Sequence, residues 1–119
     1  STRFSGLTYV GRVSAPRQTY FVYKKSRKFI VISYNLRLRE EGYFQIFRKS
    51  TINRLRRQFK GRKVTVEFLK KNKLVKRILF KGLYGFKLHF RIMAALYVLC
   101  SIGVAVHRKI GKKLLFDIS

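Results

Sequence analysis

Acidic residues are scarce in this sequence, which has four Asp and Glu against 29 Lys and Arg among 119 residues. The groups available for acid–base or metal chemistry are Glu40, Glu41, Glu67, Asp117, His89 and His107. None of them shows the spacing of a metal-dependent nuclease, and the sequence has neither a Cys/His zinc pattern nor a phosphate-binding glycine loop. We therefore expect no enzyme activity, no cofactor, no metal and no small-molecule substrate.

Cysteine and long apolar runs are also scarce. Cys100 is the single cysteine, which excludes a disulfide within the chain, and we interpret it as a small buried thiol. The longest uncharged run covers 15 residues, 92–106, whereas a membrane-spanning helix needs about 17–25. Gly103 interrupts this run, and nothing at the start of the sequence resembles a secretory signal. The pattern favours a helix over 91–101, a tight turn and a short buried strand over 103–106, so we expect no membrane span.

The sequence is rich in positive charge and in apolar residues at the same time. Its formal net charge is +25, yet 47% of its residues are hydrophobic and 15% are aromatic. A disordered basic tail has low hydrophobicity, so these fractions predict a folded core surrounded by cations. A chain so charged repels itself unless a polyanion neutralises it. Nucleic acid is the first candidate partner and an anionic membrane surface is the second.

Hydrophobic periodicity predicts an α+β protein of two small lobes. Expected strands occupy 28–33, 44–47, 64–68, 74–80, 86–90, 103–106 and 114–118. Expected helices occupy 35–43 and 91–101, and residues 20–23 fit either a strand or the end of a helix. The expected parts are an extended basic arm, an N-terminal lobe of strand–helix–strand plus a hairpin, and a C-terminal lobe of strand–helix–strand, at 1–19, 20–81 and 82–119.

Basic and aromatic residues are interleaved in two stretches, a composition that suits contacts with phosphates and stacking on unpaired bases. The candidates for RNA contact in these stretches are Lys24, Lys25, Arg27, Lys81, Tyr84 and Lys87. The most basic polar stretch, 48–63, fits a solvated loop, an exposed helix or a segment that faces a polyphosphate, and the net charge favours the last. Its candidates are Arg54, Arg56 and Arg57.

Five stretches, taken in order, resemble the small-subunit ribosomal protein eight family. They are "VYKKSRKFIVISY" (22–34), "LREEGYF" (38–44), "VEFLKKNKLVKRI" (66–78), "GLYGFKLHF" (82–90) and "YVLCSIGVAVHRKIGKK" (97–113). The closest local match is the second, where the family has a K-E-E-G-[YF]-I helix exit. The resemblance covers roughly residues 20–119 and lies in the order of the motifs more than in any one of them.

The resemblance implies a two-lobed protein that binds small-subunit ribosomal RNA beside neighbouring ribosomal proteins and supports RNA folding in translation. The family's RNA-contacting loop corresponds to 107–113 and implies contacts from His107, Arg108, Lys109, Lys112 and Lys113. The family has Ser-Thr-Ser where this chain has a basic triplet, so charged contacts would replace hydroxyl contacts. The divergence and the abundance of Lys, Ile, Phe and Tyr favour a mitochondrial ribosome over a cytoplasmic or plastid one. The alternatives are another ribosomal or nucleic-acid-binding protein and a cationic membrane-associated protein.

Overall fold

The computed structural model describes residues 6–15, 18–35, 40–79 and 85–119, and for residues 40–43 and 86 it describes the backbone alone. The strands are β1 (Thr8–Ser14), β2 (Thr19–Lys25), β3 (Lys28–Asn35), β4 (Glu40–Arg48), β5 (Lys63–Val64), β6 (Ala105–Ile110) and β7 (Lys113–Ile118). The helices are α1 (Lys49–Phe59), α2 (Val66–Lys71), α3 (Lys73–Leu79) and α4 (Gly85–Ser101). The paired strands of the two sheets are antiparallel, and helices pack beside them, so the expected α+β class is confirmed.

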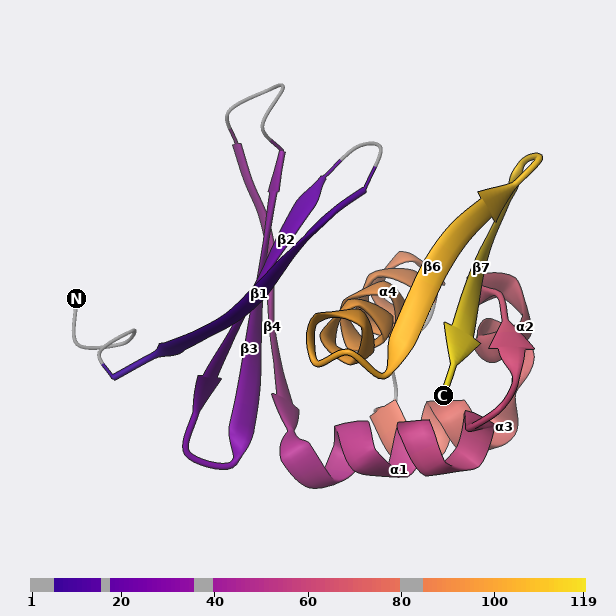
Figure 1. Cartoon of the computed structure of the whole chain (residues 1–119), viewed down its shortest axis with the longest axis horizontal. Helices are drawn as coiled ribbons and strands as arrows, with labels where there is room; N and C mark the ends of the chain where they lie inside the picture. Colours follow the sequence, from indigo (N-terminus) through magenta and orange to yellow (C-terminus); the bar gives the residue numbers. More distant parts are fainter. Residues whose placement is uncertain (1–5, 16–17, 36–39, 80–84) are drawn as a thin grey trace.

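A four-stranded sheet with the order β1-β2-β3-β4 forms one layer of the protein. Residues directly opposite one another in such a sheet point to the same face. The register places Val22 opposite Val31 and Phe29 opposite Phe47, and all four side chains are buried. Figure 1 shows this sheet at the left, with the helices on its right-hand side and α4 packed against it.

Helix α4 lies between the four-stranded sheet and a second, three-stranded sheet with the order β5-β7-β6. Its residues 94–99 are buried on every side, as expected of a helix segment that is apolar all round. The long uncharged run is therefore the core of the fold. Among the described residues, no helix combines the length and the apolar character that crossing a membrane requires. The buried cluster contains residues from both sides of the boundary expected at residue 82, and that division stays a prediction.

The elements with strong periodicity form where they were expected. The predictions for 28–33, 44–47 and 114–118 as strands and 91–101 as a helix are confirmed by β3, β4, β7 and α4. The segment 20–23 is a strand, the first of its two alternatives. Strand β6 begins later than expected, at Ala105, and runs on to Ile110.

The helix expected over 35–43 is wrong for its described residues. Asn35 ends β3 and Glu40 begins β4, and the two residues are paired in the sheet register. Residues 36–39 lie outside the described part of the chain. Asn35 and Gly42 were interpreted as helix caps, but β4 begins at Glu40, well before "FQIF", and pairs antiparallel with β3. Pairing between β3 and β4 determines the conformation here, although Asn35 and Gly42 are residue types that favour helix ends.

The hairpin expected from 64–68 and 74–80 is also wrong. The Oγ1 of Thr65 accepts a hydrogen bond from the backbone N–H of Phe68 at 3.1 Å and caps α2. The Oδ1 of Asn72 accepts from the backbone N–H groups of Leu74 and Val75 at 2.9 and 3.0 Å, at the start of α3. The alternating apolar residues predicted a strand, but only the two residues of β5 pair in a sheet.

The structure also describes three other segments for which the sequence made predictions. The strand expected over 86–90 is the first part of α4, in which Leu88 and Ile92 are buried one helical turn apart. Residues 8–14 of the expected arm are extended, and they form a strand hydrogen-bonded to β2. Most of 48–63 is the helix α1, which is exposed on one side and buries Ile52, Leu55 and Phe59 on the other; that it faces a polyphosphate stays a prediction.

The conformation of the β2–β3 turn, where Lys25 pairs with Lys28, can be tested by measuring the stability of variants. Ser26 has φ +54°, a left-handed conformation that costs a non-glycine residue about 1 kcal/mol. The equivalent position of the β6–β7 turn is Gly111, with φ +63°. We expect Ser26→Gly to raise the melting temperature by about 3–6 °C, measured by thermal unfolding. Arg27→Gly, at a neighbouring position without a positive φ, should bring no such gain; an equal gain would contradict the turn geometry.

Candidate nucleic-acid interface

One cationic surface begins where the β2–β3 turn meets the end of β4. The register places Lys25 opposite Lys28 and Lys28 opposite Arg48, so these exposed side chains form one row across the strand ends. The backbone N–H of Lys49 donates to the carbonyl oxygen of Arg27 at 2.8 Å and holds the start of α1 against the turn. The row therefore continues directly onto the helix.

The same surface extends along α1, which runs beneath the core in Figure 1. The helix buries Ile52, Leu55 and Phe59 and leaves Arg54 and Arg57 exposed on its other side. Arg57 lines an open hollow of about 240 Å³ together with Lys60, and a second hollow of about 190 Å³ together with Arg54, where α1 meets α3. Cations around shallow hollows suit the phosphate groups of a nucleic acid. We name the exposed residues Lys25, Arg27, Lys28, Arg48, Lys49, Arg54 and Arg57 the lower basic strip.

A second cationic surface is the β6–β7 hairpin. Gly111 has φ +63° in its two-residue turn, which places the exposed Lys112 and Lys113 at the tip. Arg108 is exposed on the hairpin. The alternation of the strand turns Lys109 to the opposite face, where it lines a cleft.

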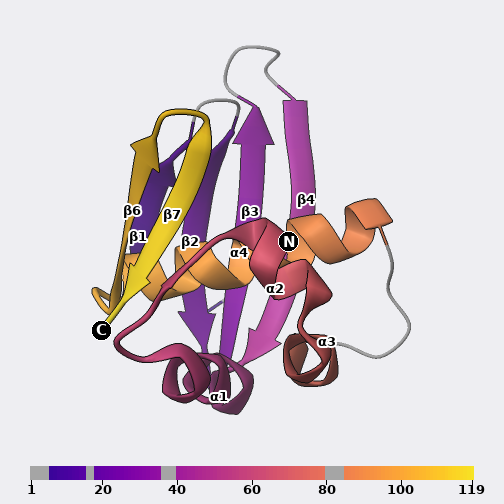
Figure 2. The same ribbon diagram turned by 90° about the vertical axis from the view of Figure 1, so that its right-hand side faces the viewer.

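The two surfaces lie at opposite ends of the molecule. Figure 2 shows α1 and the turn between β2 and β3 at the bottom, and the tip of the β6–β7 hairpin at the top. Among the predicted contacts, the structure brings Lys25 and Arg27 together with Arg54 and Arg57. It places Arg108 with Lys112 and Lys113 on the other surface.

The remaining described residues of the predicted set stand apart from the exposed cations of the two surfaces, although Arg56 lines the hollow of about 240 Å³ with Arg57. Lys24 is half-buried on the same face of the sheet as the core residue Phe29, and Lys87 is exposed at the start of α4. The Nε of Arg56 donates to the backbone oxygen of Ser119 at 3.0 Å and ties α1 to the segment after β7. Lys81 and Tyr84 lie outside the described residues.

His107 packs inside the protein. Its ring stacks against Phe116 with centroids 6.2 Å apart and meets the ring of Tyr97 edge-on at 5.5 Å. The side chain is half-buried, as its position opposite the fully buried Phe116 requires. The aromatic contacts give His107 a structural role in joining the hairpin to α4.

Sequence reasoning missed several cations of the lower basic strip as candidate contacts. Lys28, Arg48 and Lys49 were absent from the predicted set, although they adjoin residues that were in it. Helix α3 adds Lys73, Lys76 and Arg77, which are exposed near the hollow that α3 shares with α1. The i, i+3, i+7 spacing of Ile52, Leu55 and Phe59 would have separated the outer face of α1 from its core face.

The tyrosines that lie near the predicted cations on β1 and β2 differ in exposure. Tyr20 is buried at 6% exposure, and this burial raises the pKa of its phenol to about 12. Tyr23 is half-buried and meets Tyr9, which is 58% exposed, edge-on at 5.8 Å. Neither cationic surface therefore includes a wholly exposed aromatic side chain from the predicted set, among the residues that the structure describes.

Comparison with known proteins found no matching family model, no matching curated protein and no matching solved structure. The resemblance to the small-subunit ribosomal family stays a prediction.

Proposed function

We propose that this protein is a structural RNA-binding constituent of the small ribosomal subunit, where it binds ribosomal RNA and supports its folding. The observation that carries the proposal is the net charge of +25 on a chain with a continuous packed core. Four acidic residues can neutralise few of the 29 cations within the chain, and Glu67 already lies 3.7 Å from Lys70. Folded RNA supplies the missing negative charge at high density.

The placement of the cations supports an architectural role. The protein extends over 38 × 32 × 28 Å, and the lower basic strip and the β6–β7 hairpin lie at opposite ends of it. Basic surfaces at opposite ends of a protein of this size would contact separate RNA segments. A rigid core between them would fix the distance between those segments.

The mitochondrial ribosome is the proposed location, and neighbouring ribosomal proteins are proposed partners. Both statements rest on the resemblance and on the divergent composition. Cross-linking of the chain to its neighbours in an intact ribosomal particle tests them, and cross-links confined to large-subunit components would contradict the assignment to the small subunit.

The exposed residues of the hairpin provide the first test of RNA binding. We expect replacement of Arg108, Lys112 and Lys113 together by glutamine to weaken binding to small-subunit RNA roughly 10²-fold at physiological salt. The slope of log affinity against log salt should fall by about 2.7, because each lost phosphate contact contributes about 0.9. Filter-binding titrations over a range of salt concentrations measure both quantities.

A charge-retaining variant is the matched control for the hairpin. Arg108→Lys with Lys112→Arg and Lys113→Arg keeps all three charges and should bind RNA with nearly the parental affinity. The folded state of both variants is checked by their thermal unfolding. Parental binding by the glutamine variant would show that the hairpin does not contact RNA, and flotation with anionic liposomes in preference to RNA would favour the membrane-associated alternative.

A further inference from the structure

A cleft of about 520 Å³ opens between the two sheets. Neither the lower basic strip nor the exposed hairpin residues Arg108, Lys112 and Lys113 line it. Its floor is a stripe of α4 made by His89, Met93 and Tyr97, which are spaced four residues apart, and by Phe90 beside them. One wall comes from the four-stranded sheet and from Ala15 and Gln18 beside it, and the other comes from the β6–β7 hairpin. The wall residues are Ala15, Gln18, Tyr20, Asn35, Lys109 and Leu114. Figure 1 shows that α4, which carries the floor residues, lies between β2 and β6.

Two buried polar atoms of the cleft residues have no hydrogen-bond partner among the described residues. They are the hydroxyl oxygen of Tyr97, whose residue is 0% exposed, and the Oε1 of Gln18. The third such atom in the described chain, the Oγ of Ser101, is not in a cleft residue. Leaving a buried polar atom unpaired destabilises a protein, so a pair of them at one cleft indicates a ligand that completes their hydrogen bonds. Burial raises the pKa of the Tyr97 phenol, which keeps its proton for donation.

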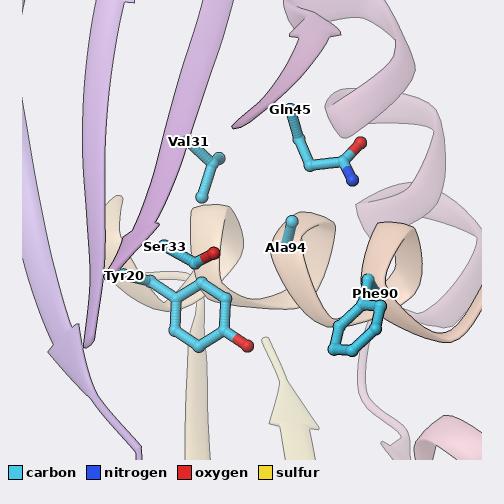
Figure 3. A pocket seen from close by; sticks show the side chains of 6 residues that line it. All are labelled: Tyr20, Val31, Ser33, Gln45, Phe90 and Ala94. Carbon is cyan, nitrogen blue, oxygen red and sulfur yellow. The ribbon is translucent and has the colours of Figure 1, made fainter. Parts of the chain in front are cut away.

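Aromatic rings provide flat apolar contact beside these polar atoms. The ring of Tyr20 lies 4.5 Å from that of Tyr97, with an angle of 33° between the ring planes. Figure 3 shows Tyr20 and Phe90 side by side, with the Tyr20 hydroxyl directed toward Phe90. The two side chains also border a cavity of only about 10 Å³ behind the cleft, between the sheet and α4, so the interior side of this wall is closely packed. The cleft therefore presents a ring surface with hydrogen-bonding groups next to it.

The charges of the cleft favour an anion. Lys109 reaches it from the hairpin, and none of its lining residues, all of them in the described chain, is acidic. Burial lowers the pKa of His89, as does the charge of Lys70 to a smaller extent, while Glu67 acts in the opposite direction. His89 is thus neutral near pH 7, and Lys109 is the cation that an anionic group in the cleft would meet.

We propose that this cleft binds one unpaired RNA nucleotide, whose base contacts the Tyr20 and Phe90 side of the cleft and bonds to Tyr97 and Gln18 while its phosphate meets Lys109. A volume of about 520 Å³ suits a ligand of this size. Unpaired bases are recognised in this manner, by aromatic contact and hydrogen bonds to their edges. A purely aliphatic ligand would leave both polar atoms unpaired. The inference rests on the proposed RNA-binding function and adds to the two basic surfaces a site for an unstacked base.

An RNA hairpin with one bulged nucleotide, compared with the same hairpin fully paired, tests the cleft on the whole protein. We expect the parent to prefer the bulged RNA roughly tenfold, measured by fluorescence anisotropy with each of the four bases at the bulge. Tyr97→Phe removes only the hydroxyl and should reduce the preference to about twofold or less. Its melting temperature should not fall, because the lost hydroxyl makes no hydrogen bond in the free protein.

A pair of neighbouring leucines gives a matched control. Leu114→Trp fills the cleft and should abolish the preference for the bulge, whereas Leu115→Trp, on the opposite face of β7, should leave it intact. Equal parental affinity for both RNAs, or a preference that survives Tyr97→Phe and Leu114→Trp, would overturn the cleft inference and leave the phosphate contacts standing. Failure of the parent to bind either RNA would overturn the proposed function and the cleft inference together.

Discussion

Replacing Lys25, Arg27, Arg54 and Arg57 together by glutamine should reduce the affinity for small-subunit ribosomal RNA roughly 10³-fold at physiological salt. These four residues belong to the lower basic strip, and all four side chains are exposed. Their loss should lower the salt slope by about 3.6, since four phosphate contacts contribute about 0.9 each. Filter binding to the RNA at several salt concentrations gives both values. The stability of the protein should hardly change, because exposed cations with few acidic neighbours contribute little to it.

The control exchanges the cations without removing charge. Lys25→Arg, Arg27→Lys, Arg54→Lys and Arg57→Lys together should bind within a few-fold of the parent, because contacts to phosphates depend mainly on charge. Parental affinity together with an unchanged salt slope in the glutamine variant would show that the strip faces solvent or a protein partner. A loss of affinity without a change of slope would point to a damaged fold and contradict an electrostatic contact.

The two basic surfaces are expected to act independently. The hairpin variant and the strip variant alter residues at opposite ends of the protein, so their effects on binding free energy should add. If the protein joins two RNA segments, each variant should still bind the segment that faces the intact surface. A combined variant that is no weaker than the strip variant alone would show that one surface carries all of the RNA binding.

The parts of the fold that the sequence predicted are those in which local pattern and tertiary contact agree. β3 is apolar on both faces and β7 follows a glycine turn, and both were predicted as strands. The prediction of strands over 64–68 and 74–80 was wrong because it gave more weight to the alternating apolar residues than to the helix-capping residues Thr65 and Asn72. From the sequence alone, a residue whose side chain caps a helix cannot be distinguished from a residue of the same type in a turn.

The candidate interface was predictable in its charge but not in its grouping. Arg56 and Arg57 are adjacent in the sequence and line one hollow together, yet Arg56 also bonds to Ser119, whereas Arg57 borders the second hollow beside Arg54. His107 and Arg108 are separated in the same way by the alternation of β6. Such assignments need the direction of each side chain, which depends on the helix phase of α1 and on the register of β6 with β7.

The cleft could not be predicted from the sequence because two of its floor residues, His89 and Phe90, were predicted in a strand and not in the helix that holds Met93 and Tyr97. With 86–90 extended, His89 would point away from Leu88 and Phe90. As a helix, the same segment places His89 on one stripe with Met93 and Tyr97 and brings Gln18 and Lys109 to the same cleft from distant parts of the chain. The Tyr97 hydroxyl is recognisable as buried and unpaired only in the folded chain, where the Tyr97 ring contacts His107 of the hairpin.

The Arg91 guanidinium makes a set of contacts that joins three elements of the fold. Its Nε donates to the carbonyl oxygen of Leu79 at 3.2 Å, and its Nη1 donates to the Oε1 of Gln45 at 3.1 Å and the carbonyl oxygen of Ile46 at 2.8 Å. The guanidinium also lies 4.0 Å from the ring centroid of Phe47. One side chain thus joins α4, α3 and β4. Its partial burial lowers the pKa of the guanidinium group.

Arg91→Ala should therefore lower the free energy of unfolding by about 2–3 kcal/mol, because two part-buried acceptors and one exposed acceptor lose their donor and the Phe47 ring loses its cation. The melting temperature should fall by about 10 °C, and denaturant unfolding gives the free energy directly. Lys87→Ala removes an exposed cation one turn earlier on α4 and should change the stability by less than about 0.5 kcal/mol. Arg91→Lys keeps the charge, but an ammonium lacks the planar array of donors that reaches all three acceptors, so its stability should lie between those of the parent and Arg91→Ala. Equal stability of Arg91→Ala and Lys87→Ala would mean that the contacts joining β4, α3 and α4 through this side chain do not form in solution.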